Sequence, residues 1–211
     1  IYFQGFIQLM QKLYFNYPEN IKFKNGLSIA HERLGAICIE IGQLDSALIH
    51  FQIRLGHAEE LYTLYPDNVS FKNGLAIAYW KLGDSHFRLG RQGNTYNLFQ
   101  KAIQLSSELV EQFPRHKEFQ RNFNFMQYKF TQMENMSQED MKVEIALLNI
   151  VEPMKQQVQA AIKPDEKVAL QEKVVEQLLS LVEEYPNNLR LRTNLGKAEG
   201  NLTWYQLMID E

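Results

Sequence analysis

The sequence predicts an all-α fold built from a repeated pair of helices, on three observations. Proline follows an aromatic residue at intervals of 48 residues, at Pro18, Pro66 and Pro114, and Tyr185-Pro186 is a more distant fourth marker. The tetrapeptide FKNG occurs at residues 23–26 and again at 71–74. Between the prolines, apolar residues recur every three or four positions, which is the helical period. A fixed period of this length is typical of stacked repeats.

The first helix of each repeat, helix A, follows the proline. Its apolar face carries Phe23, Leu27, Ala30, Leu34 and Ile41 in the first full repeat, with the spacing of one side of a helix. Gly42, and Gly90 in the next repeat, predict a left-handed residue at the C-terminal end. Either Asp67 or Asn68 can cap the helix after Pro66. In FKNG we expect phenylalanine to pack inward, glycine to allow close approach, and lysine and asparagine to face solvent.

The second helix, helix B, ends at the next proline. Its inward positions are Leu44, Leu48, Phe51, Leu55, Ala58, Tyr62 and Tyr65 in one repeat and Tyr96, Phe99, Ile103, Ser106, Val110 and Phe113 in the next. Steps of four and three along both sets predict one buried face. Proline cannot continue a helix, because it lacks the N–H group and its ring clashes with the preceding turn.

These positions resemble the tetratricopeptide repeat (TPR) family. The matching residues are Leu34-Gly35, Gly42, Ala47 and Phe51 in the first repeat, and Tyr79, Leu82-Gly83, Gly90 and Phe99 in the second. The resemblance covers most of residues 6–136 and part of 165–211, and it implies a right-handed α-solenoid of antiparallel helix pairs. A TPR unit has about 34 residues. The longer repeat found here therefore predicts about two extra turns in each helix.

The sequence divides into four parts. Residues 1–5, IYFQG, resemble the end of an engineered protease site and are interpreted as an expression-tag remnant. Residues 6–136 hold the regular repeats, 137–164 an irregular helical insertion, and 165–211 a final truncated helix pair. We expect a fragment of a longer array. One period before Phe51 stands Phe3, so the remnant is expected to complete the first helix B by packing on the first helix pair.

Within the insertion, Ser137 and Asp140 predict a capped helix start. Apolar residues then continue past Pro153 with helical spacing, although proline breaks or kinks a helix. Alternation of helices A and B requires an odd number of helices before Tyr185-Pro186. This favours three, at about 138–152, 154–162 and 165–184, over one kinked helix through 138–162.

Composition and motifs exclude several classes of function. A net charge of −3 and a pI near 6.0 argue against nucleic-acid binding, which requires a basic surface. Cys38 is the only cysteine, so an intramolecular disulfide is impossible, and we expect a buried, inert thiol. No apolar run reaches the roughly 20 residues of a membrane span. We therefore expect a soluble, cytoplasmic protein.

No catalytic or metal-binding motif is present in the sequence. The five histidines, His31, His50, His57, His86 and His116, have no metal-ligand spacing, and we expect them to be structural or at the surface. His50 and His57 would lie about 10 Å apart along one helix, too far for a shared metal. We expect no enzyme, no metal, no cofactor and no small-molecule substrate.

The TPR resemblance implies a binding groove lined by one face of the A helices. Carried over by alignment, the expected groove residues are Asn25, Ile29, Glu32, Asn73, Ile77, Trp80, Asp84, Phe87, Arg121, Phe125 and Tyr128. The aromatic ones would anchor a partner, because Trp, Tyr and Arg dominate binding hot spots. The alternative for Phe87 and Phe125, and less so for Trp80 and Tyr128, is packing against the neighbouring repeat. Glu32 and Ala36 replace the lysine and asparagine with which chaperone-binding TPRs hold a terminal carboxylate.

We therefore expect a scaffold that binds a protein or peptide segment in its concave groove. The alternative is a structural or oligomerising spacer, or a sensor array, in a larger protein. Long helical repeats of bacterial proteins that carry a signalling NTPase or protease module offer a loose resemblance for this alternative. The scaffold and the spacer hypotheses differ in whether the aromatic face of the A helices is free to bind a partner.

Overall fold

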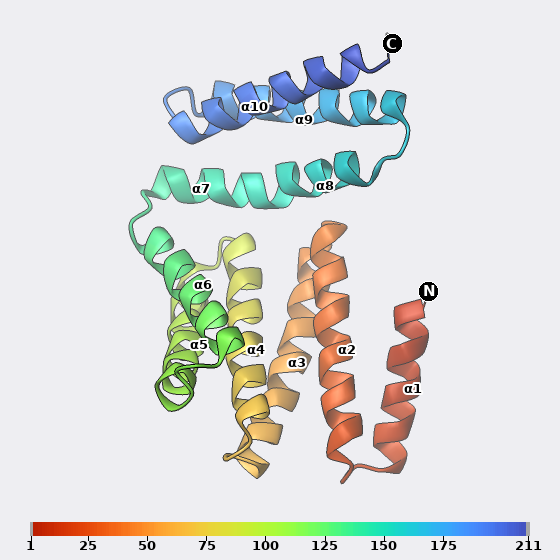
Figure 1. The fold of residues 1–211 in the computed structure, drawn as a ribbon, viewed down its shortest axis with the longest axis vertical. Coiled ribbons are helices and arrows are strands. Elements are labelled where there is room, and N and C mark those ends of the chain that lie inside the picture. Colours follow the sequence, from red (N-terminus) through yellow and green to blue (C-terminus); the bar gives the residue numbers. More distant parts are fainter. Residues whose placement is uncertain (1, 210–211) are drawn as a thin grey trace. The chain divides into compact units, whose positions relative to one another are not determined.

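The computed structural model describes residues 2–209, apart from the side chains of residues 2–4, 7 and 92. All regular structure in residues 2–209 is helical, which confirms the prediction of an all-α fold (Figure 1). The chain forms two compact units, residues 1–135 and 136–211, which are described separately below. The expected packing of Phe3 lies outside the described side chains.

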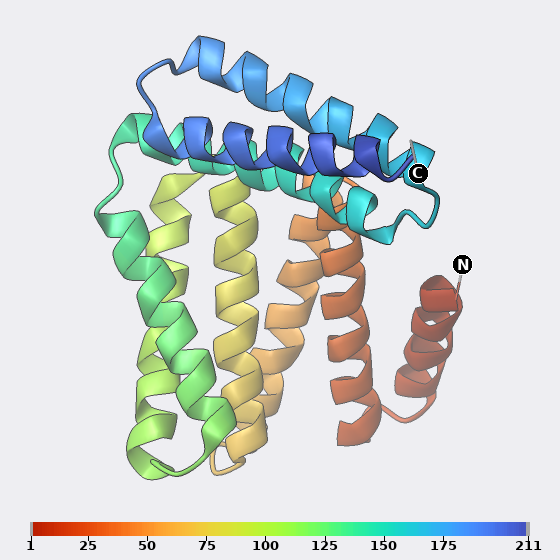
Figure 2. The same cartoon turned by 45° about the horizontal axis from the view of Figure 1, so that its top comes forward.

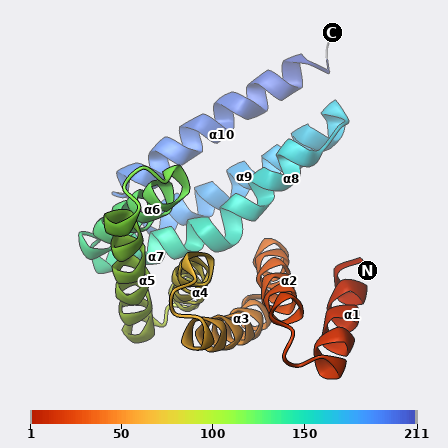
Figure 3. The same cartoon turned by 60° about the horizontal axis from the view of Figure 1, so that its bottom comes forward.

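The first unit consists of six helices that alternate between two layers. They are α1 (Tyr2–Asn16), α2 (Ile21–Glu40), α3 (Leu44–Leu64), α4 (Val69–Arg88), α5 (Gln92–Gln112) and α6 (Lys117–Glu134). Each packs mainly against the helix before it and the helix after it. The A helices α2, α4 and α6 form one layer, and the B helices α1, α3 and α5 form the other (Figures 2 and 3).

The period of 48 residues is visible in the contacts between helices A and B. A Cβ atom added at Gly35 would lie 2.7 Å from the ring of Phe51, and one at Gly83 would lie 2.7 Å from Phe99. Both rings are fully buried. The glycine of the leucine-glycine pair in helix A is therefore needed for the contact with the phenylalanine of helix B. Only glycine lets the ring lie directly on the helix.

The helix ends repeat in the same way. The Asn20 side chain accepts hydrogen bonds at the start of α2, and Asn68, not Asp67, does so at the start of α4. Gly42 and Gly90 have φ angles of 75° and 71°, as predicted for C-terminal caps. The aromatic residue before each proline packs on the phenylalanine six positions later. Their ring centroids are 6.0 Å apart for Tyr17–Phe23 and 5.9 Å apart for Tyr65–Phe71.

The expectation that the FKNG lysines and asparagines face solvent is wrong: Asn73 is buried and Asn25 is half-buried. Lys24 and Lys72 are buried; Lys24 pairs with Glu60, and Lys72 lies 2.7 Å from Glu108. The aliphatic stem of lysine can bury while its ammonium group reaches an ion partner at the edge. Burial lowers the pKa of Lys24, but hydrogen bonds to Glu60 and Tyr14 outweigh it and raise the pKa overall. The repeated tetrapeptide thus holds helix A to helix B.

The second unit contains α7 (Gln138–Ala146), η1 (Leu147–Val151), α8 (Glu152–Ala160), α9 (Pro164–Glu184) and α10 (Leu189–Leu207). Its core is formed by Val143, Leu147, Val151, Val158, Val174, Leu178, Leu181, Leu191 and Ala198. The Ser137 side chain caps α7 as predicted, by accepting a hydrogen bond from the Asp140 amide.

The expected helix break at Pro153 does not occur. The segments α7, η1 and α8 follow one another without a gap, so residues 138–160 form one continuous helix. In η1 the Glu152 N–H bonds the carbonyl of Leu147, five residues back. This wider π turn lets the helix continue into Pro153, which lies in the first turn of α8, where a missing N–H costs little. Two helices therefore fill residues 137–184, and the alternation argument was wrong.

Candidate functional site

The residues predicted to line a groove lie on α2, α4 and α6, which form one layer of the first unit (Figure 3). Their exposure differs from helix to helix. Those on α4 are buried or half-buried, those on α6 are exposed, and those on α2 are mixed. The layer is therefore not a uniform binding wall.

On α4, the aromatic residues expected as free anchors are buried. Trp80 is only 8% exposed and Phe87 only 2%. The Trp80 ring stacks on Phe99 at a centroid distance of 4.1 Å and meets the edge of Phe125 at 5.6 Å. The packing alternative holds for Phe87, and the expectation of a free Trp80 ring is corrected, because α5 and α6 supply the rings that cover it.

The polar positions of α4 are also occupied by neighbours. The buried Asn73 side chain donates to the Glu118 carboxylate at 3.3 Å and accepts from Asn122 at 3.2 Å. Asp84 accepts a hydrogen bond from Arg88 on its own helix at 2.8 Å, and Ile77 is half-buried. Hydrogen bonds at one end and the Trp80–Phe125 contact further along therefore join α4 to α6.

The predicted residues on α6 form an exposed strip. Phe125 is 52% exposed and Tyr128 63%, and Arg121, one turn before Phe125, is exposed as well. The opposite side of α6 carries the buried residues Phe119, Met126 and Met133. Phe125 also contacts the buried Trp80 ring, and about half of the Phe125 side chain remains exposed to solvent.

On α2, the three predicted residues are less uniform. Ile29 is 42% exposed, and Asn25 is half-buried. Glu32 accepts a hydrogen bond from Arg54 of α3 at 3.0 Å. Arg54 is buried and also donates to the Ser28 hydroxyl at 2.6 Å and to the Gly74 carbonyl at 3.2 Å. Glu32 is therefore part of an internal network that links α2, α3 and α4, which sequence spacing alone could not identify.

A second open surface of the first unit lies between α5 and α6. A hollow of about 530 Å³ there is lined by Ile103, Phe130 and several polar residues, among them Glu108, Glu111 and Glu134. Gln127, Phe130 and Thr131 of α6 correspond in the repeat to Tyr79, Leu82 and Gly83 of α4. Gly83 packs against Phe99 of its helix B, α5, and Tyr79 lies under Lys101 of α5. On α6, Gln127 and Thr131 are exposed, whereas Phe130 packs on Tyr96 and Phe99.

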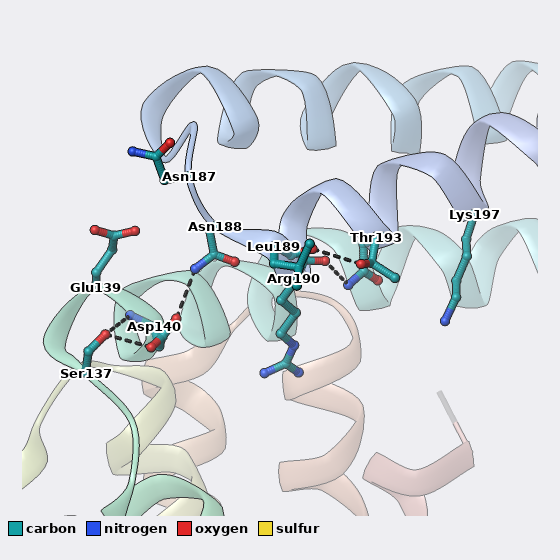
Figure 4. A pocket seen from close by; sticks show the side chains of 10 residues that line it. Ser137, Glu139, Asp140, Asn187, Asn188, Leu189, Arg190, Thr193 and Lys197 are labelled. Carbon is teal, nitrogen blue, oxygen red and sulfur yellow. Dashed lines mark hydrogen bonds between the residues drawn. The ribbon is translucent and has the colours of Figure 1, made fainter.

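In the second unit, a hollow of about 720 Å³ is lined mainly by polar residues (Figure 4). Ser137 and Asp140 at the start of α7 face Asn188 at the start of α10, and the Asn188 amide donates to Asp140 at 3.0 Å. The hydrogen bond from the Ser137 hydroxyl is the main cause of a lowered pKa for Asp140. Arg190, which also lines it, pairs with Glu144. These groups cap helices and pair with one another, an arrangement that supplies no activated nucleophile.

No group of three or more His, Cys, Asp or Glu side chains among the described residues is arranged so that it could hold a metal ion. Cys38 is buried, as predicted, and burial raises the pKa of its thiol. None of the helices within residues 2–209 is both long and apolar enough to cross a membrane.

Comparisons with known proteins name no family for this chain. No model of a protein family matches the sequence, and a search of curated proteins finds no related one. Functional inference therefore depends on the repeated residues and on the exposed strip of α6.

Proposed function

We propose that the first unit is a TPR-like, right-handed α-solenoid that binds a protein or peptide segment. Three repeated features support a relation to TPR architecture: the glycine-on-phenylalanine contacts, the left-handed glycines and the asparagine caps. Each recurs after 48 residues, and the glycines and phenylalanines stand at positions that resemble the family pattern. Stacked helix pairs of this kind generate an extended surface that commonly receives peptides.

The binding surface is proposed to centre on the exposed strip of α6, formed by Arg121, Phe125 and Tyr128. The observation that carries this proposal is the exposure of two large aromatic rings one turn apart, one of which rests on a buried tryptophan. A preorganised aromatic surface loses little conformational entropy on binding. Ile29 is a further exposed apolar residue on α2, and Trp80 supports the Phe125 ring on its buried side.

The chemistry of the strip favours a partner segment with an apolar or aromatic side chain followed by an acidic group. The rings offer apolar area and stacking faces. Arg121 presents a planar donor fork that matches a carboxylate. The segment can be extended or helical, because both forms are bound by helical repeats.

Selection of peptides from a displayed library on the full chain would test the proposed function. Selected peptides should bind Phe125→Ala/Tyr128→Ala at least ~30-fold more weakly than the parent, the equivalent of about 2 kcal/mol. Ile49→Ala is the matched control, because Ile49 is an exposed apolar residue on the B-helix layer. Peptides that bind the double variant and the parent equally would place the site elsewhere, and failure to select any peptide would favour the spacer alternative.

A further inference from the structure

Three histidines of the first unit form a cluster between α1, α2 and α3. The Nδ1 atoms of His31 on α2 and His50 on α3 are 3.1 Å apart. The ring of His57, two turns further along α3, lies 6.4 Å from that of His31. Tyr14 of α1 meets the edge of His57 at 6.0 Å. His31 thus lies next to two histidines that are separated along α3. The spacing of the histidines in the sequence does not indicate these contacts.

The geometry of this cluster suits neutral imidazoles. Two Nδ1 atoms in hydrogen-bond contact can share one proton, so one ring donates and the other accepts. If both rings become charged, this hydrogen bond is lost and two cations stand next to each other. His31 is only 4% exposed, and the buried Nδ1 of His57 has no hydrogen-bond partner. Water therefore offers little solvation for an additional charge.

The charged groups around the cluster compensate for protonation only in part, because Glu60 favours the charged form of His57 whereas Lys24 and Arg54 oppose it. Tyr14 is the neighbour on α1, Lys24 and Glu32 lie on α2, and Arg54 and Glu60 lie on α3. Glu32 is paired with Arg54, and Glu60 is paired with Lys24. Each carboxylate already has a cationic partner, and two of the neighbouring groups are themselves positive.

The next repeat has no such cluster. One period after His31, His50 and His57 stand Tyr79, Leu98 and Leu105. Tyr79 and Leu105 pack there in an apolar cluster with Leu75 and Ala78. The same helix pair can therefore be built without histidine, and the first repeat alone combines three imidazoles at this seam.

We propose that His31, His50 and His57 form a proton-sensitive joint that loosens the packing of α1, α2 and α3 in acid. The hairpin of α4 and α5 holds one buried histidine, His86, whose pKa is lowered by burial and by Arg91, and no such cluster, so its response to acid should be weaker. The proposed device acts on the folding of the first repeat and is independent of the peptide-binding proposal.

The direction of the pH effect follows from burial. Desolvation, with a contribution from the other two histidines, lowers the pKa of His31 to about 4 from an ordinary value of 6.5. Burial also lowers the pKa of His50 and of His57. The opened state therefore binds more protons between these values. Stability is complete above pH of about 6.5 and is lost as the pH falls towards about 4.

Hydrogen–deuterium exchange of the full chain, corrected for the intrinsic pH dependence of exchange, would test the proposal. Between pH of about 7.5 and about 5, protection of α1, α2 and α3 should fall at least about tenfold more than protection of α4 and α5. The matched variant His31→Tyr/His50→Leu/His57→Leu carries the residues of the second repeat, and in it α1, α2 and α3 should no longer lose more protection than α4 and α5. An equal loss in both hairpins, or an unchanged difference in the variant, would overturn the proposal.

A titration of the histidine Cε1 protons by NMR provides an independent readout on the unmodified chain. His31 should titrate well below pH 6.5, with a midpoint near 4, and the single change His50→Leu should alter this midpoint. This measurement does not require the triple variant to fold. A His31 that titrates near pH 6.5 would refute the proposed joint.

Discussion

The hairpins α2–α3 and α4–α5 share one backbone design but differ in the chemistry of their interiors. Both bury a phenylalanine on a glycine and a lysine against a glutamate. Where the first hairpin has Ser28, Glu32 and Arg54, the second has Ala76, Trp80 and Ala102. One interior is a hydrogen-bonded network, and the other is a stack of aromatic rings.

The repeat specifies how closely the helices approach one another, and it leaves open which side chains fill the space between them. The glycine–phenylalanine contacts that both hairpins share depend on shape, because only a residue without a side chain leaves room for the ring. The variable positions need only volume and satisfied polar groups, which either an Arg–Glu–Ser network or a tryptophan can supply. Differences between the hairpins in stability and in response to acid should therefore trace to these variable positions.

The largest difference in the cost of a substitution, measured as loss of unfolding free energy, is expected between the equivalent residues Trp80 and Glu32. Trp80→Ala should lower the free energy of unfolding by about 3–5 kcal/mol, because it removes a buried ring between Phe99 and Phe125. Glu32→Ala should cost only about 1–2 kcal/mol, because Arg54 retains its bonds to Ser28 and Gly74. Urea denaturation followed by circular dichroism measures both. Equal costs would mean that the two interiors do not differ as described.

A somewhat smaller effect is expected at Arg54. Arg54→Ala should cost about 3 kcal/mol, because it leaves the Glu32 carboxylate and the Ser28 hydroxyl without their donor. The triple variant Ser28→Ala/Glu32→Trp/Arg54→Ala copies the second hairpin and should recover at least about 2 kcal/mol of this loss. If the triple variant is less stable than Arg54→Ala alone, the two interiors are not interchangeable.

The smallest effect is expected for the feature that both hairpins share. Lys24→Met and Lys72→Met should each cost about 1 kcal/mol or less, because their carboxylate partners are largely exposed and methionine keeps the buried stem. The two costs should agree within about 0.5 kcal/mol in the same urea experiment. A cost several times larger for one lysine would indicate that the ion pairs have different roles in the two hairpins.

Much of the fold was predictable from the sequence because its signals are local. Proline ended each B helix, and Gly42 and Gly90 adopted the left-handed conformation expected of them. The prediction was wrong at Pro153. Proline was expected to break the helix, but the π turn of η1 lets the helix continue past it. Within the predicted groove, Phe125 and Tyr128 are exposed and Trp80 is buried, although all three share one alignment.

The amino-acid sequence alone determined the repeat, the helix ends and the glycine–phenylalanine contacts, because each follows from backbone conformation or from the spacing of side chains along one helix. The tertiary structure decided which aromatic rings face solvent, which histidines meet and where Arg54 finds its partners. Those outcomes depend on residues that lie 19 to 45 positions apart in the chain. Only the approach of separate helices brings them within contact, and helical periodicity carries no information about that distance.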